Sequence, residues 1–243
     1  MNEELLRQVL SYYRDLGFNE IYRVKPSPLV EITSSGAAVP ANLPSTLPPL
    51  APYDDTLEKI RADIGDCRRC PLHAGRQTIV FGDGNSHAKL VFVGEGPGED
   101  EDIQGIPFVG RAGQLLTAMI ENTAKKEGIP LTRADVYICN VVKCRPPKNR
   151  TPEPEEMAMC GQFLFRQLEA IKPKAICSLG GTATRALLGT KEGVTKLRGQ
   201  WHKWRDIPVM VTYHPSYLLR AYNVTPKREA WEDLKKLFHF VFD

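Results

Sequence analysis

The chain has 243 residues, of which 42% are hydrophobic and 25% charged, which suits one globular domain of about 200 residues plus an appendage. No apolar run reaches the roughly 18 residues of a membrane span, and the acidic start Met-Asn-Glu-Glu is unlike a secretory signal, so we expect a cytoplasmic protein. The net charge of +3 permits a nucleic-acid partner without demanding one, since a solvated lysine surface gives the same total. The six cysteines then indicate metal ligands, nucleophiles or core residues rather than a disulfide framework.

The N-terminal part, residues 1–25, has hydrophobic residues at helical spacing, which predicts a short amphipathic helix over 3–16. Residues 26–53 carry seven prolines among small and polar residues, which predicts a flexible, partly polyproline linker. We expect the helix to be either a docking module for a protein partner or a solubilising extension of a monomeric protein.

From residue 54 to 243 the sequence alternates between strand-like and helix-like blocks. The β-rich runs are bounded by turn residues and cover 89–94, 136–142, 175–180 and 208–213. Helices are predicted over 113–127, 153–171, 181–188 and 231–240. This alternation predicts an α/β fold with a parallel sheet covered on both faces. Ligands on such sheets bind beyond the carboxyl ends of the strands, where Glu95, Asn140 and His214 fall.

An acidic glycine-rich loop, Gly94-Glu-Gly-Pro-Gly-Glu-Asp-Glu-Asp102, follows the first strand-like run. Glycine-rich turns after a strand often cradle phosphate, which makes a nucleotide-binding protein one alternative. Its carboxylates repel phosphate, however, and the Gly-Lys-Ser/Thr sequence of a phosphate loop is missing. We expect Glu99, Asp100 and Asp102 to form an exposed acidic turn.

Four cysteines have polar surroundings or spacing that suits metal ligation. Cys67 and Cys70 form a C-x-x-C pair, and Cys144 and Cys160 follow with 15 residues between them. Four thiolates suit either zinc or an iron–sulfur cluster, and spacing alone does not separate the two. The alternative, reduced core cysteines, fits Cys177 and Cys139 better, because they lie in strand-like runs.

Four ordered segments together resemble the family 4 uracil-DNA glycosylases, bacterial and archaeal enzymes that carry a 4Fe-4S cluster. They are the acidic glycine loop, Pro107-Phe-Val-Gly-Arg-Ala-Gly-Gln-Leu-Leu116, Asn140-Val-Val-Lys-Cys-Arg-Pro-Pro-Lys-Asn-Arg150 and His214-Pro-Ser-Tyr-Leu-Leu-Arg220. The resemblance spans about residues 54–240 and implies a three-layer α/β/α sandwich around a four-stranded parallel sheet. It also implies that Cys67, Cys70, Cys144 and Cys160 hold the cluster, and it favours iron–sulfur over zinc.

The implied activity is hydrolysis of the bond between uracil and deoxyribose in single- or double-stranded DNA, which leaves an abasic site for base-excision repair. A related group that bonds covalently to its product carries a Lys-Arg-Arg-Ile-His insertion, which this chain lacks. The rival from another class is a non-catalytic iron–sulfur module for nucleic-acid binding or electron transfer.

The resemblance assigns roles to three side chains. Phe108 stacks on the extruded base, Asn140 reads uracil N3–H and O4 with its amide, and His214 hydrogen-bonds uracil O2 as negative charge grows there. The alternatives are a core phenylalanine, an asparagine that ties down a strand end and a structural histidine.

In the best-known relatives an aspartate or asparagine after the first strand positions the attacking water, and here the matching residue is Gly96. Glu95 or Glu101 remains to orient water or to favour the developing cation. Glu101 is also placed to crowd the C5 position and exclude thymine. Backbone N–H groups of the turn, Gly98 among them, are expected to contact the base.

DNA contacts are expected from two segments. The cationic residues beside Cys144 are candidates to bind DNA phosphates, and they are Lys143, Arg145, Lys148 and Arg150. The alternative is a solvated loop without a role in binding. Asn149 in the same segment is a candidate substrate residue. After His214 we expect a wedge that fills the gap left by the flipped base, formed by Tyr217, Leu218, Leu219 and Arg220. Arg220 is expected to contact a phosphate. The alternative is that these residues are an ordinary helix start.

Overall fold

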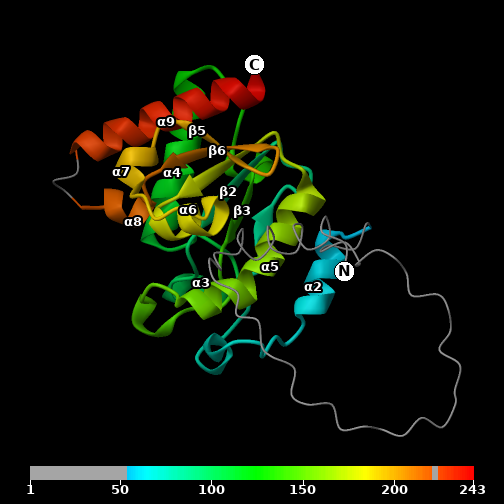
Figure 1. Cartoon of the computed structure of the whole chain (residues 1–243). Helices are drawn as coiled ribbons and strands as arrows, with labels where there is room; N and C mark the ends of the chain where they lie inside the picture. The colour runs from blue at the N-terminus through cyan, green and yellow to red at the C-terminus, as the bar shows by residue number, and fades with distance from the viewer. Residues whose placement is uncertain (1–53, 221–223) are drawn as a thin grey trace, which may run out of the picture.

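The chain is described by a computed structural model that covers residues 54–220 and 224–243 (Figure 1). The predicted helix over 3–16 and the linker over 26–53 lie outside the described residues.

A six-stranded sheet with the order β1-β3-β2-β4-β6-β5 forms the middle layer. Its four inner strands are parallel, namely β2 (Leu90–Gly94), β3 (Tyr137–Asn140), β4 (Ala175–Leu179) and β6 (Ile207–Thr212). These confirm the expected parallel sheet. The two edge strands, β1 (Asp83–Gly84) and β5 (Trp201–Trp204), are antiparallel and were not predicted, because neither is an apolar run.

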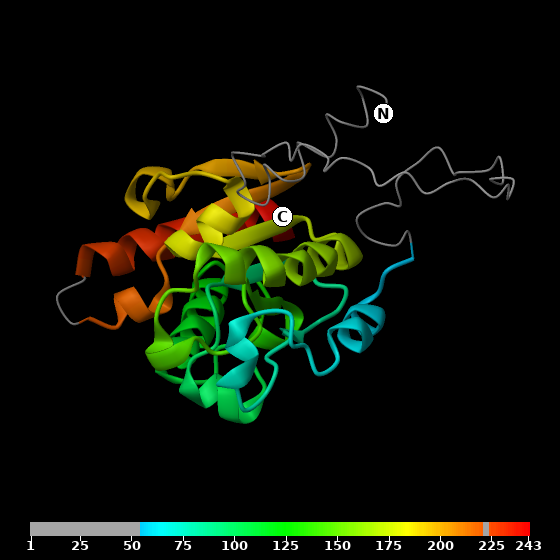
Figure 2. The same ribbon diagram turned by 60° about the horizontal axis from the view of Figure 1, so that its bottom comes forward.

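Helices cover both faces of the sheet, which makes the three-layer sandwich (Figures 1 and 2). On one face α4 (Arg111–Lys126) and α9 (Val224–Phe242) pack against strand residues such as Phe92 and Cys177. On the other face α2 (Leu57–Ile64), α5 (Pro154–Ile171) and α6 (Gly181–Leu188) pack against residues such as Val93 and Ile176. Alternate strand residues point to opposite faces, so strands buried on both sides read as continuous apolar runs. No described helix is long and apolar enough to cross a membrane.

Short helices lie in the loops between the main elements. They are α3 (Glu99–Gln104), α7 (Val194–Leu197) and α8 (Pro215–Leu218), with 3-10 turns at Pro71–Ala74, Arg133–Asp135 and Pro147–Asn149. The expected acidic turn is therefore helix α3, whose first turn carries four acidic residues that suit the positive end of a helix.

The order of the strands reverses beside β2, because the chain runs from β2 to β3 on one side and then crosses to β4 on the other. The loops that follow β2 and β4 diverge at this point and leave room for a ligand.

Candidate active site

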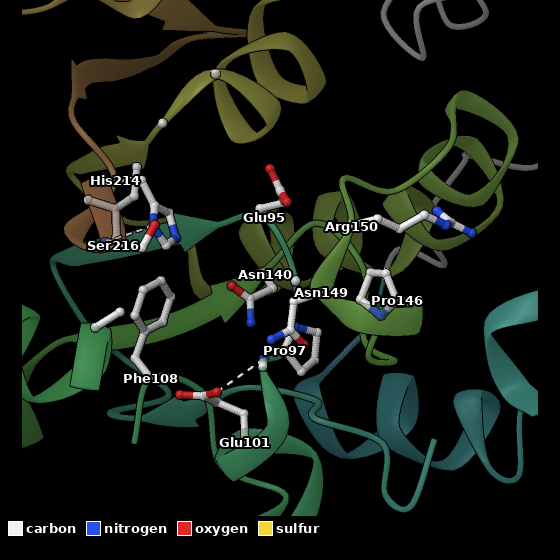
Figure 3. Close-up of a pocket in the computed structure, with 16 residues that line it drawn as sticks. Glu95, Pro97, Glu101, Phe108, Asn140, Pro146, Asn149, Arg150, His214 and Ser216 are labelled. Atoms are coloured by element: carbon white, nitrogen blue, oxygen red, sulfur yellow. Dashed lines mark hydrogen bonds between the residues drawn. The ribbon is translucent and has the colours of Figure 1, made fainter. Parts of the chain in front are cut away.

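A cavity of about 340 Å³ lies at the carboxyl edge of the parallel strands (Figure 3). All of the expected catalytic and substrate-binding residues line it together with one expected DNA-contact residue, Arg150; they are Glu95, Gly96, Gly98, Glu101, Phe108, Asn140, Asn149 and His214. Residues that were not predicted complete the lining, and they are Pro97, Ala112, Pro146, Leu179, Gly180, Gly181 and Ser216.

Asn140 ends strand β3 with its side chain buried, at 1% exposure. Its Oδ1 atom has no hydrogen-bond partner among the described residues. A Cβ atom at Gly94 would lie 2.4 Å from Oδ1 and 2.5 Å from the Phe108 ring, so glycine at this position lets the amide and the ring share the space. A buried acceptor without a donor costs about 1–3 kcal/mol, so this oxygen is placed to accept a hydrogen bond from a group that enters the cavity.

Phe108 adopts a left-handed backbone conformation with φ of 54°, which is rare for an aromatic residue. Arg133 holds this loop by donating to the carbonyl oxygens of Pro107 at 2.6 Å and Phe108 at 3.0 Å. The ring is buried against the cavity, and its centroid lies 5.6 Å from that of His214. Such strain at a cavity wall is typical of a functional residue.

His214 caps helix α8 and is fixed by Ser216, whose backbone N–H donates to Nδ1 at 3.1 Å. Burial lowers the pKa of His214 to about 4, so the imidazole is neutral at pH 7. A neutral ring that accepts at Nδ1 carries its proton on Nε2. Ser216 was not among the predicted site residues. Its position two residues after His214 is the feature of the sequence that could have indicated this contact.

Glu101 is occupied by the loops around it. Its Oε1 atom accepts from the backbone N–H groups of Val109 and Gly110, each at 2.9 Å, and Oε2 accepts from that of Gly98 at 3.0 Å. The carboxylate therefore braces the start of α3 against the loop that carries Phe108 (Figure 3).

Glu95 is placed differently, because one hydrogen bond is recorded for its carboxylate within the described ranges, from the Thr182 hydroxyl to Oε2. The side chain is half-buried at the cavity wall (Figure 3). Gly96 follows, and a Cβ atom there would lie 2.7 Å from the Val142 side chain, so a larger residue at this position would displace Val142.

Asp102 corrects one expectation. It was assigned to an exposed turn, but it is buried and accepts from the backbone N–H of Gln77 at 2.9 Å and of Thr78 at 3.3 Å. The helical period turns this carboxylate inward, where two N–H donors satisfy it.

Lys143 is also a correction, because it is fully buried and lies where no DNA phosphate reaches it. Its Nζ atom donates to the Asn140 backbone oxygen at 2.8 Å and to Gln167 at 2.6 Å. The side chain supports the end of β3 from inside the domain.

The other cations of this segment lie nearer the surface. Arg145 donates to Asn149 at 2.8 Å and pairs with Glu99 at 3.5 Å. Arg150 forms a two-pronged pair with Glu156 at 2.7 and 2.8 Å, while Lys148 is exposed.

The residues of the expected wedge after His214 lie in and just after helix α8, which buries one of them and exposes the others. Leu218 is buried at 1% exposure and packs in the core, so its assignment to the wedge is wrong. Tyr217 and Leu219 are each 38% exposed, and the Arg220 guanidinium lies 5.6 Å from the Tyr217 ring.

The four candidate cysteine ligands, Cys67, Cys70, Cys144 and Cys160, line one small cavity of about 10 Å³. N–H donors address three of the sulfurs: Arg69 reaches Cys67 at 3.4 Å, Arg76 reaches Cys144 at 3.4 Å, and the Lys143 backbone reaches Cys160 at 3.2 Å. Donors of this kind suit sulfur that carries negative charge.

These donors and the shared cavity fit a group held by thiolates. In the described part of the chain, no three or more His, Cys, Asp and Glu side chains form a cage for a single ion. Cys139 and Cys177 are fully buried in strands, as expected.

Fold and cavity together define a class of protein: an α/β domain whose ligand cavity is lined by an aromatic ring, a buried amide oxygen without a partner among the described residues and a neutral imidazole. The chain belongs to the uracil DNA glycosylase superfamily, whose sequence profile it matches over residues 81–235.

Similar proteins carry a more specific name. The chain is 47% identical over 190 residues to a type-4 uracil-DNA glycosylase of Thermotoga maritima, a match that covers 77% of this chain and 96% of that protein. It is 43% identical to a type-4 enzyme of Sulfurisphaera tokodaii, over 75% of this chain and 84% of the relative. A third type-4 enzyme, from Archaeoglobus fulgidus, is 42% identical over 75% of this chain and 92% of its own length.

Proposed function

We propose that this protein is a uracil-DNA glycosylase, which hydrolyses the N-glycosidic bond of deoxyuridine in DNA and thereby starts base-excision repair. The observation that carries the proposal is the buried Asn140 Oδ1 atom without a hydrogen-bond donor, beside the Phe108 ring. Uracil supplies both missing partners, since its N3–H donates to Oδ1 and its face stacks on the ring.

The Asn140 amide also discriminates between bases. It accepts from uracil N3–H and donates to uracil O4, whereas cytosine presents the reverse pattern at these two atoms. A buried polar mismatch lowers the affinity for a ligand much more than the loss of one methyl contact does. The Asn140 amide therefore supports selection of uracil over cytosine.

Uracil must leave the base stack to enter this cavity, which costs a few kcal/mol and least in single-stranded DNA. Stacking on Phe108 offsets part of that cost. Arg133 holds the strained loop by its hydrogen bonds to Pro107 and Phe108, so the ring is in position before the base arrives.

Bond cleavage leaves negative charge on uracil and oxocarbenium character on the sugar. In our proposal the Nε2–H of neutral His214 donates to uracil O2 as that charge develops, and Ser216 keeps the ring in the required tautomer. The transition state gains more from this hydrogen bond than the bound substrate does.

Of the two candidate carboxylates, we assign the water to Glu95. Glu101 already accepts three backbone hydrogen bonds, whereas Oε1 of Glu95 has no recorded partner within residues 54–220 and 224–243. A carboxylate at the cavity wall orients water by accepting its proton and favours the positive sugar electrostatically.

We further propose that Cys67, Cys70, Cys144 and Cys160 hold a 4Fe-4S cluster. The four cysteines line one shared cavity, which supports a group held by four thiolates. The same ligands suit zinc or an iron–sulfur cluster, and the resemblance to the family 4 enzymes favours the cluster. When bound, the cluster would supply iron–thiolate bonds that tie these segments together, and it would add a redox-active group to the domain.

DNA contacts are assigned to the exposed residues near the cavity. Lys148 and Arg220 are proposed to meet phosphates, and Tyr217 and Leu219 to fill the gap that the extruded base leaves. Arg145 and Arg150 stay candidates, although each already pairs with a carboxylate.

Release of free uracil tests the proposal. A single-stranded oligonucleotide with one uracil is incubated with the protein, and matched strands with cytosine or thymine at that position serve as controls. We expect uracil and an abasic site from the first strand only. Binding without release would instead support the non-catalytic iron–sulfur module.

A further inference from the structure

The side chain of Glu95 is held by a residue far along the chain. Thr182 lies in the first turn of α6, is buried and donates from its hydroxyl to Oε2 of Glu95. The two residues are 87 positions apart in the sequence. Their contact joins the loop after β2 to the helix after β4, across the point where the strand order reverses.

The Thr182 hydroxyl is itself addressed from one side. The Nη2 atom of Arg185, one helical turn later, lies 3.4 Å from Thr182 Oγ1 and donates to it. A hydroxyl has one proton, and with Arg185 as donor that proton is directed to Glu95. Arg185, Thr182 and Glu95 thus form a short chain of hydrogen bonds with a fixed direction.

This contact determines which oxygen of Glu95 faces the substrate. Without this hydrogen bond the glutamate side chain samples several rotamers. Most of them do not hold a water molecule where the reaction needs it, so the rate of cleavage falls. With Oε2 engaged by Thr182, Oε1 is the oxygen left to accept a hydrogen bond from water in the cavity.

We propose that Thr182 is a positioning residue that orients the Glu95 carboxylate toward the attacking water, and this inference rests on the proposed glycosylase activity. Thr182 itself does not line the cavity. It acts through Glu95, so its effect falls on the rate of bond cleavage and leaves DNA binding unchanged.

Thr182→Val is the direct test, because valine keeps the shape and removes the hydroxyl. We expect kcat for uracil release from single-stranded DNA to fall about tenfold or more with KM unchanged, as for loss of one hydrogen bond to a charged group. Thr182→Ser restores the hydroxyl and should restore most of the rate. Thr123→Val, a buried threonine of α4 outside the cavity lining, is the matched control for loss of a buried hydroxyl.

A double-substitution cycle shows whether Thr182 acts through Glu95. In a Glu95→Gln background, Thr182→Val should cost much less than it does alone, because the orientation no longer matters. Melting temperatures of all variants show that each is folded.

The outcomes separate this inference from the activity on which it rests. A wild-type protein that releases no uracil overturns the proposed function and this inference with it. Normal turnover in Thr182→Val, the same fold loss in the Glu95→Gln background, or failure of serine to restore the rate overturns the role of Thr182 alone.

Discussion

Among single side chains, Asn140 gives the clearest prediction about the preference for uracil. Asn140→Ala removes the group that matches uracil, so we expect kcat/KM for uracil release to fall about a hundredfold or more. Asn122→Ala, on the exposed surface of α4, is the control and should leave the rate unchanged. Unchanged activity and uracil preference in Asn140→Ala would remove the residue from the base-reading role.

The protonation of His214 gives a prediction that needs no substrate. Burial lowers its pKa from 6.5 in the unfolded chain to about 4, so between these values the unfolded state binds more protons than the folded one. The contribution of neutral His214 to stability is therefore complete above about pH 6.5 and is lost as the pH falls toward 4. NMR of labelled histidine should show the Nε2–H tautomer from pH 8 to about 5, and a titration midpoint near 6.5 would contradict this environment.

Among the secondary-structure elements, the start of α4 sets the position of the Phe108 loop. A Cβ atom at Gly113 would lie 1.9 Å from the Phe108 carbonyl group, a clash with backbone that must be relieved by movement. Replacing glycine by alanine inside a helix usually stabilises a protein by about 1 kcal/mol. At Gly113 the clash makes the same replacement destabilising.

We therefore expect Gly113→Ala to destabilise the protein by about 2 kcal/mol and to lower uracil release about a hundredfold by displacing Phe108. Thermal melting and single-turnover rates measure the two effects. Gly75→Ala is the control, since no atom lies within 4 Å of its added Cβ and its φ is −110°. A more stable, active Gly113→Ala protein would show that the loop accommodates the methyl group.

For the molecule as a whole, the four cysteines connect segments that are distant along the chain. Cys67 and Cys70 follow α2, Cys144 follows β3, and Cys160 lies in α5. A cluster held by all four would cross-link these segments on one side of the sheet and stabilise the folded state against the unfolded one.

Cys160→Ala should abolish the brown colour and the iron and sulfide of anaerobically purified protein and lower the melting temperature by about 5–10 °C. Cys177→Ala removes a fully buried thiol outside the shared cavity and should keep the full iron content. Equal iron in both variants would count against the proposed ligand set.

Much of the fold was predictable from local sequence. The four parallel strands and four main helices follow from apolar runs and helical periodicity, with bounds within two residues of the expected ones except at α9, which begins at Val224 rather than at Trp231. The edge strand Trp201–Trp204 was missed because an exposed strand has no apolar run. Helix α3 was missed because its acidic residues read as a turn.

The sequence by itself determined which residues gather at the carboxyl edge of the sheet, since strand ends in a parallel sheet meet there whatever the remaining packing. It did not determine which carboxylate is available, or that Lys143 and Leu218 are buried. Those outcomes depend on partners brought together by the path of the chain: backbone N–H groups that occupy Glu101, Thr182 that holds Glu95, and Gln167 that receives Lys143. Hydrogen-bond partners at long sequence separation leave no periodic signal, so only the tertiary structure decided them.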